Sequence, residues 1–247
     1  MNYKTYKYKG ININYVDFGD EKKKPIVYLH GWGQNIEMML PIAKQFIKKN
    51  RLIILDLPGF GKSEEPKEIW SLEDYAEMLN SLLKELKIAK PNLIGHSFGG
   101  KISIVYSLKY PVDKLILLSS PYKVKIQKLS WKVKMLKKLK NVPGLNKLAN
   151  TIKSHIGSRD YKAATPKMRD ILVKHINTDL ENEVKKINCP TFIIWGTNDG
   201  EVSVEDAYSL ENAIPNSGLS VYEGCTHYAY LENLNKTNAI IDAFINK

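Results

Sequence analysis

The residues best suited to chemistry surround Ser97, in the pentapeptide GHSFG at positions 95–99. The apolar run 91–97 predicts a buried strand that ends at this serine, and a helix-compatible segment follows at once. Glycines two positions to either side allow a turn too crowded for β-carbons, and such a turn lifts a serine hydroxyl clear of the sheet. The pattern therefore predicts a nucleophilic serine at a strand-to-helix corner.

A serine hydroxyl needs a base to take its proton, and that base is commonly a histidine oriented by a carboxylate. His227 follows the last predicted strand, in a loop just before the last helix, and Asp199 lies in a glycine-containing loop after the preceding strand. Glu201, Glu205 and Asp206 are less suitable acids, because they lie at or inside the next helix. His227 and Asp199 are therefore the candidate base and acid.

An acyl-transfer site also needs backbone N–H groups that stabilise the negative charge developing on the carbonyl oxygen. Phe98, the residue after the serine, would supply the first N–H group. The stretch LHGWGQN follows the first buried strand, and Trp32 would supply the second, because Gly31 and Gly33 permit an unusual turn. Trp32 and Phe98 are therefore the candidate oxyanion-hole residues.

The elements that must position these residues alternate along the chain. Apolar runs without strict alternation predict strands covered on both faces, at 25–31, 51–59, 91–97, 113–120, 190–196 and 219–225. Amphipathic helix patterns lie between them; the one at 71–88 begins with Ser71 as N-cap and Asp74 three residues later. The N-terminal 17 residues from Tyr3 predict an antiparallel hairpin at the sheet edge. This order predicts a three-layer α/β fold with a mostly parallel, twisted sheet.

The alternation of predicted strands and helices stops after residue 120 and resumes at about residue 186. We expect a core made of residues 1–120 and 186–247, with a basic helical cap inserted at 121–185. Trp131, Met135 and Leu139 share one face of a helical pattern in this cap and are candidates to line an acyl pocket. His155 and His175 also lie there, and we interpret them as surface or packing residues.

The net charge of +11 is concentrated in the predicted cap. Residues 121–175 contain 15 Lys and Arg against two Asp, which leaves the rest of the chain slightly acidic. A lysine-rich solvated face is the simplest interpretation, and an electrostatic collar for an anionic or carrier-bound acyl substrate is the alternative. The segment matches no nucleic-acid-binding module and has few aromatic residues, so we expect no nucleic-acid partner.

The composition is that of an ordinary globular protein, with 43% hydrophobic and 26% charged residues and a mean hydropathy of −0.31. No apolar leader or membrane-length apolar run is visible, so we expect a cytoplasmic protein without a membrane span. Cys189 and Cys225 lie far apart and outside any ligand-like cluster. We therefore expect neither a disulfide, nor a metal site, nor a cofactor.

Five motifs in order, HGWGQN, DLPGFGKS, GHSFGG, WGTND and CTHY, resemble those of the α/β-hydrolase family over nearly the whole chain. Ser97, Asp199 and His227 follow the family's order of nucleophile, acid and base. HGWG and DLPGFGKS together are similar to the capped carboxylesterases, the group that includes pimeloyl-acyl-carrier-protein methyl ester esterase. Serine at position 97 argues against the dehalogenases and epoxide hydrolases of the family, which carry an aspartate there.

The resemblance implies a serine hydrolase that cleaves small-molecule carboxylic esters through an acyl-enzyme intermediate. A thioesterase or an amidase would use the same triad, and fold and triad do not choose among these substrates. A ligand-sensing protein of the same fold is a further alternative.

Overall fold

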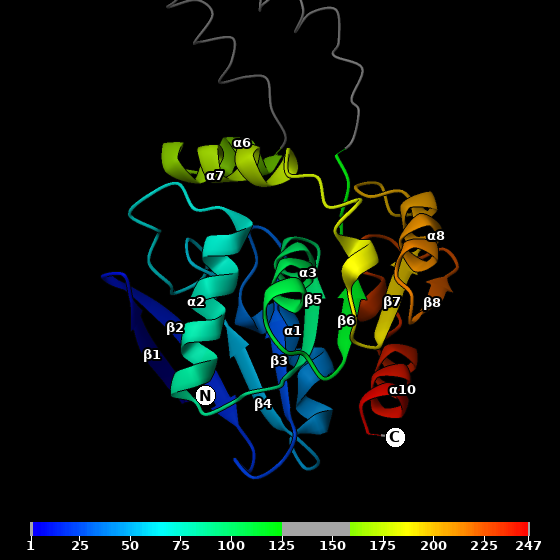
Figure 1. Ribbon diagram of the computed structural model, residues 1–247, viewed down its shortest axis with the longest axis horizontal. Coiled ribbons are helices and arrows are strands. Elements are labelled where there is room, and N and C mark those ends of the chain that lie inside the picture. Colours follow the sequence, from blue (N-terminus) through cyan, green and yellow to red (C-terminus); the bar gives the residue numbers. More distant parts are fainter. Residues whose placement is uncertain (1, 125–158, 247) are drawn as a thin grey trace, which may run out of the picture.

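The computed structural model describes residues 2–124 and 159–246, which form one eight-stranded sheet in the order β1-β2-β4-β3-β5-β6-β7-β8 (Figure 1). β1 and β2 form an antiparallel hairpin at one edge, and β2 also runs antiparallel to β4. All later pairings are parallel. The strand bounds are Tyr3–Tyr8, Ile11–Phe18, Pro25–Leu29, Arg51–Leu55, Asn92–His96, Leu115–Leu118, Thr191–Gly196 and Ser217–Tyr222 for β1 to β8.

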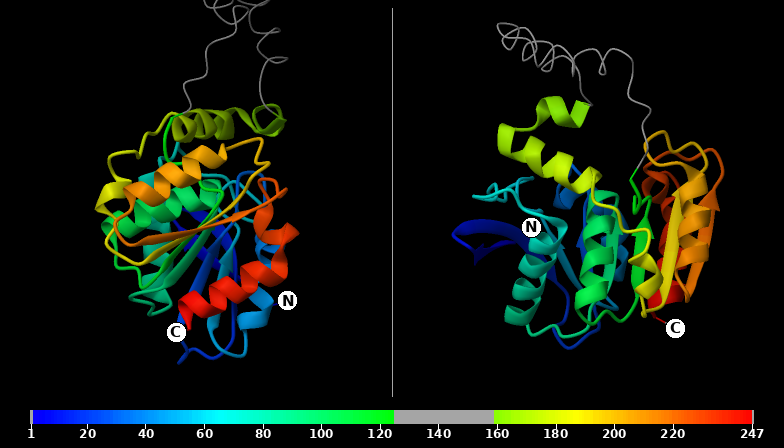
Figure 2. Two further views of the ribbon diagram at one scale, coloured as in Figure 1. Left: turned by 90° about the vertical axis from the view of Figure 1, so that its right-hand side faces the viewer. Right: turned by 45° about the horizontal axis from the view of Figure 1, so that its top comes forward.

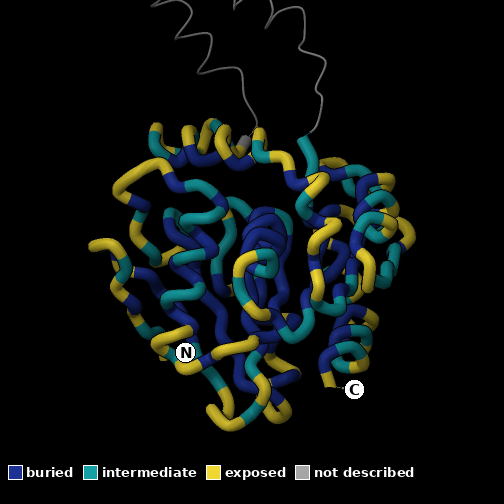
Figure 3. The backbone as a smooth tube through the Cα atoms, viewed as in Figure 1, coloured by how far each residue is buried: buried dark blue, intermediate teal, exposed yellow. Residues whose placement is uncertain are grey.

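Helices cover both faces of the sheet, and the central strands are buried (Figure 3). Each central strand contributes apolar residues to both of its faces, as a strand covered on both sides requires. Along β3, Val27 and Leu29 join the core cluster under α2 and α3, whereas Ile26 and Tyr28 join the cluster under α1 and α10. The α/β three-layer prediction is thus confirmed. The described helices are α1 Ile36–Ala43, α2 Leu72–Glu85, α3 Phe98–Lys109, α6 Arg159–Ala163, α7 Pro166–Ile176, α8 Val204–Ala213, α9 Ala229–Glu232 and α10 Leu234–Ile245, with single 3₁₀ turns at Lys44–Phe46 and Val184–Lys186.

Two local predictions are confirmed at single residues. Ser71 caps α2: its Oγ accepts a hydrogen bond from the Asp74 N–H, and the Asp74 carboxylate accepts one from the Ser71 N–H. The hairpin turns at Lys9 and Gly10, both at positive φ, which suits a tight two-residue connection.

The chain between β6 and β7 carries α6 and α7 over the carboxyl ends of the strands (Figure 2). Tyr122, Leu180 and Val184, at the two ends of this stretch, pack into the same core cluster as the sheet. The boundaries of the predicted cap, residues 121 and 185, remain a prediction. Trp131, Met135 and Leu139 lie outside the described residues.

Cys189 and Cys225 are both free thiols. Within residues 2–124 and 159–246, no helix has the length and apolar character needed to cross a bilayer.

Candidate active site

Ser97 lies directly after β5 and directly before α3, at φ +50° and ψ −111°. A residue with a β-carbon rarely adopts this conformation, so the surrounding structure must hold it there. The Ser97 N–H donates to the Leu118 carbonyl oxygen over 2.9 Å, which ties the corner to β6. The serine is partly exposed while its neighbours His96 and Phe98 are buried, so the corner presents it outward as the pentapeptide predicts.

The two glycines of the pentapeptide are required by close backbone approach. A β-carbon at Gly99 would lie 2.4 Å from the Leu29 carbonyl oxygen and 2.5 Å from that of His30. At Gly95 it would lie 2.4 Å from Ser103 Oγ and 2.6 Å from the Gly100 Cα. The predicted crowding around the turn is confirmed.

Gly99→Ala is therefore expected to destabilise the protein by about 1–3 kcal/mol or more, because rigid backbone atoms must move to admit the methyl group. Gly200→Ala is the matched control, since no atom lies within 4 Å of a β-carbon there and φ is not positive. It should change stability by no more than about 0.5 kcal/mol. Urea unfolding measures both; equal midpoints for the two variants would contradict the crowding argument.

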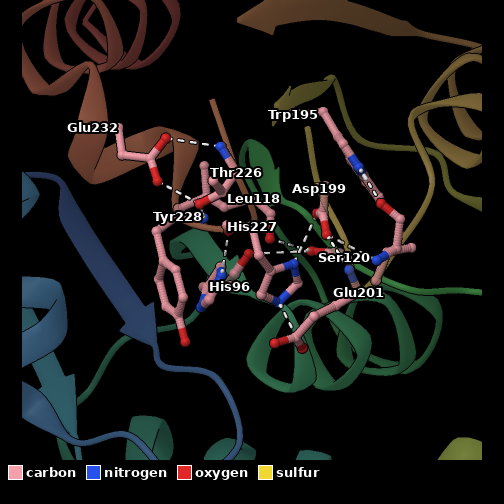
Figure 4. Close-up of polar contacts among 12 residues, drawn as sticks. His96, Leu118, Ser120, Trp195, Asp199, Glu201, Thr226, His227, Tyr228 and Glu232 are labelled. Atoms are coloured by element: carbon pink, nitrogen blue, oxygen red, sulfur yellow. Dashed lines mark hydrogen bonds and ion pairs between the residues drawn. The ribbon is translucent and has the colours of Figure 1, made fainter. Parts of the chain in front are cut away.

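His227 and Asp199 are brought together by the loops that follow β8 and β7 (Figure 4). His227 Nδ1 lies 2.8 Å from Asp199 Oδ2, and the two side chains are 6% and 0% exposed. A carboxylate can only accept, so Nδ1 carries the proton and Nε2 of the neutral ring is left as an acceptor. The ring is thus oriented as a general base requires.

The Asp199 carboxylate is held in its ionised form by its partners. Burial raises the pKa of Asp199, but hydrogen bonds from His227 and from the N–H groups of Val202 and Glu201 outweigh it and keep the pKa below its ordinary value. Those N–H groups donate to Oδ1 over 2.8 and 2.9 Å, which leaves Oδ2 facing the imidazole.

None of the three alternative acids pairs with His227 Nδ1. Glu201 has its carboxylate 3.8 Å from His227 Nε2, on the ring edge opposite Asp199, and its side chain is 63% exposed. Asp206 pairs with Lys123 Nζ at 2.8 Å, and Glu205 accepts a hydrogen bond from Ser203 Oγ at the start of α8. Among these four carboxylates, only that of Asp199 pairs with Nδ1.

His227 is also linked to the serine corner, through the backbone. His96 Nε2 lies 3.1 Å from the His227 carbonyl oxygen, and the two rings are 4.8 Å apart. In the described chain no hydrogen bond joins Ser97 Oγ to His227 Nε2, a contact that often tightens only with substrate bound. From the sequence, His96 is only a member of the GHSFG motif, because nothing local reveals its contact with a residue 131 positions away.

The loop after β3 supplies the other candidate donor. Gly31 N–H donates to Gln34 Oε1 over 3.0 Å and Gln34 N–H donates to the Gly31 carbonyl oxygen over 3.2 Å, so the turn closes around Trp32. The Trp32 and Phe98 rings pack edge to face, 5.2 Å apart. Within the described residues neither backbone N–H of this pair donates a hydrogen bond.

Two buried residues that the sequence analysis did not single out hold this loop. His30 Nε2 accepts from the Leu57 N–H over 2.9 Å, so its Nδ1 donates to the Gly31 carbonyl oxygen over 2.7 Å, and burial lowers its pKa to about 4. Asp56 accepts from the N–H groups of Ile36 and Lys62, both over 2.8 Å. His30 and Asp56 are the first residues of the motifs HGWGQN and DLPGFGKS, and this position is the sequence feature that could have pointed to their roles.

Comparison with known proteins agrees with this architecture. The sequence profile of the α/β hydrolase fold matches residues 24–146. A 2-hydroxy-6-oxononadienedioate/2-hydroxy-6-oxononatrienedioate hydrolase of Pseudomonas putida is 27% identical over 95% of this chain and 92% of its own. The crystal structure of an enol-lactonase from Burkholderia xenovorans superposes with a TM-score of 0.78 at 20% identity, over 99% of this chain and 100% of that one.

An esterase from Exiguobacterium antarcticum gives a TM-score of 0.75 at 24% identity, over 96% of this chain and 97% of that one. The chain belongs to the α/β-hydrolase family, and it is a hydrolase.

Proposed function

We propose that this hydrolase cleaves carboxylic esters with Ser97 as nucleophile, His227 as general base and Asp199 as the carboxylate that orients the imidazole. The observation that carries the proposal is the 2.8 Å contact between His227 Nδ1 and Asp199 Oδ2, in a pair whose side chains are almost fully enclosed. It fixes the tautomer in which Nε2 can accept the serine proton.

In the proposed reaction, Ser97 Oγ attacks the ester carbonyl carbon while its proton moves to His227 Nε2. The carbonyl oxygen becomes an oxyanion, stabilised by the N–H groups of Trp32 and Phe98. The C–O bond to the alcohol then breaks, and His227 returns the proton to the leaving alcohol. Water attacks the acyl-enzyme by the same steps in reverse and releases the acid and free Ser97.

A substrate panel tests the proposal. We expect a small aryl ester to be turned over faster than an acyl thioester or an aminoacyl amide of the same acyl group, and a series of acyl lengths then defines the pocket. Faster cleavage of the thioester or the amide would replace the ester assignment by one of those activities. Stoichiometric labelling by a fluorophosphonate without turnover above one per site would favour a ligand-sensing protein.

The P. putida relative, similar along almost the whole chain, favours one second candidate. Its name specifies hydrolysis of 2-hydroxy-6-oxononadienedioate, so this compound belongs in the same panel. A kcat/KM for it above that of every ester would move the assignment to this substrate.

A further inference from the structure

A buried lysine lies one helical turn from the proposed nucleophile. Lys101, on α3, is 1% exposed, and its Nζ donates to the His175 carbonyl oxygen on α7 over 2.8 Å. In the described part of the chain it forms no ion pair. Burial without a paired carboxylate lowers the pKa of Lys101 to about 8.

The contact caps the carboxyl end of α7. The Val173 carbonyl oxygen accepts from Asn177 Nδ2 over 2.7 Å, and that of Lys174 accepts from Thr178 Oγ1 over 2.9 Å. These two caps are local to α7, whereas Lys101 reaches His175 from 74 residues away. A cation at a helix carboxyl end is electrostatically favoured, so this bond both caps α7 and ties it to α3.

The bond from Lys101 to α7 holds the His175 imidazole against the side chains of Trp32 and Phe98. The His175 imidazole stacks on the Trp32 ring at 5.5 Å and 19°, and its centroid is 4.6 Å from that of Phe98. Burial and the neighbouring Lys101 lower the pKa of His175 to about 3, so the ring is neutral at working pH. The Lys101 backbone N–H makes the ordinary helical bond to the Ser97 carbonyl oxygen over 3.0 Å, so Lys101 lies one turn along α3 from Ser97.

We propose that Lys101 is a positioning residue for hydrolysis at Ser97: its ammonium group seats α7 so that His175 holds Trp32 and Phe98 in place. This inference rests on the proposed function. A methionine would fill the same space without burying a charge, and replacing a buried charge in this way is often neutral or stabilising. The contribution of Lys101 should therefore appear in the rate rather than in stability.

Lys101→Met is expected to lower kcat for a small aryl ester by about 10- to 100-fold, because small displacements of groups that stabilise the transition state are costly. KM should change much less, and the melting temperature should not fall. Lys109→Met, at the end of the same helix, is the matched control, since Lys109 is 40% exposed and pairs only loosely with Glu77 at 3.9 Å. It should retain the wild-type kcat.

The wild-type pH profile tests the proposal without a substitution. As pH rises through about 8, Lys101 loses its charge, its bond to His175 weakens to a neutral one, and kcat should fall. His175 on α7 and the exposed Asp179 after it are the described ionisable groups that act on this pair. The pKa is lower in the folded than in the unfolded state, so folding stability from Lys101 rises with pH above about 8. Deprotonation of Lys101 therefore does not itself destabilise the folded state.

Lys101→Met should lack this alkaline decline. Wild-type kcat in Lys101→Met would overturn the positioning role. Fluorophosphonate labelling of Ser97 and its loss in Ser97→Ala report on the proposed function separately. A labelled wild-type enzyme together with wild-type kcat in Lys101→Met would remove only the role of Lys101, whereas turnover that survives Ser97→Ala would remove the esterase mechanism.

Discussion

Ser97→Ala should reduce kcat for an aryl ester by about 10⁶, the loss typical of removing the nucleophile of a serine hydrolase. The strained turn between Gly95 and Gly99 leaves Ser97 partly exposed, and the adjoining His96 contacts the His227 carbonyl oxygen. The fold should persist, since the side chain is partly exposed and caps no helix N–H group.

The measurement is steady-state turnover together with mass-spectrometric detection of fluorophosphonate labelling. Ser107→Ala, on the same helix α3, is the control; its hydroxyl only donates to the Ile104 carbonyl oxygen, so activity and labelling should persist. A folded Ser97→Ala protein with near-wild-type turnover would show that the nucleophile is misassigned.

Asp199→Asn should lower kcat by about 10⁴, as expected when the histidine is forced into the wrong tautomer. The N–H groups of Glu201 and Val202 donate to Oδ1 and would keep the amide oxygen of an asparagine in that place. The amide NH₂ would then face His227 Nδ1 and donate to it. The ring proton would move to Nε2, which could no longer accept the proton of Ser97.

The Glu201→Gln variant tests which of the two carboxylates near His227, that of Asp199 or that of Glu201, acts as the triad acid. The Glu201 side chain is 63% exposed and can pair with His227 Nε2, 3.8 Å away, only while the imidazole is protonated. Such an exposed pair is worth at most about 1 kcal/mol, which corresponds to less than a tenfold change in rate. Both variants are assayed with the same ester at several pH values. An active Asp199→Asn enzyme beside an inactive Glu201→Gln enzyme would reverse the assignment of the acid.

Local sequence patterns were sufficient to predict the three-layer α/β fold and the strand-to-helix turn at Ser97. Continuous apolar runs identified the parallel strands, because a strand covered on both faces has no polar side to alternate with. The capping pair Ser71 and Asp74 and the close approach at Gly95 and Gly99 were also readable, since each depends on a few adjacent residues or on a turn with one geometry. In the sheet, β2 pairs with β4 and not with β3, the next strand in the chain; no local pattern specifies this long-range pairing.

The contacts that complete the site were decided by the tertiary structure. Asp199 and Glu201 are two residues apart and chemically alike, and only the path of the loop after β7 places Asp199 against Nδ1 and Glu201 at the opposite edge. His175, interpreted from sequence as a surface or packing residue, is buried against Trp32, and among the described residues its Nδ1 has no hydrogen-bond partner.

Lys101 reads in sequence as one charge among many, yet it lies buried against α7. Sequence by itself determined the strands, the corner and the order of the candidate residues, because these follow from periodicity and turn chemistry within a few neighbours. The pairs Asp199–His227 and Lys101–His175 span 28 and 74 residues. Such pairs form only when the parallel strands bring their carboxyl ends to one edge of the sheet, and their geometry is set by packing among elements distant in the chain.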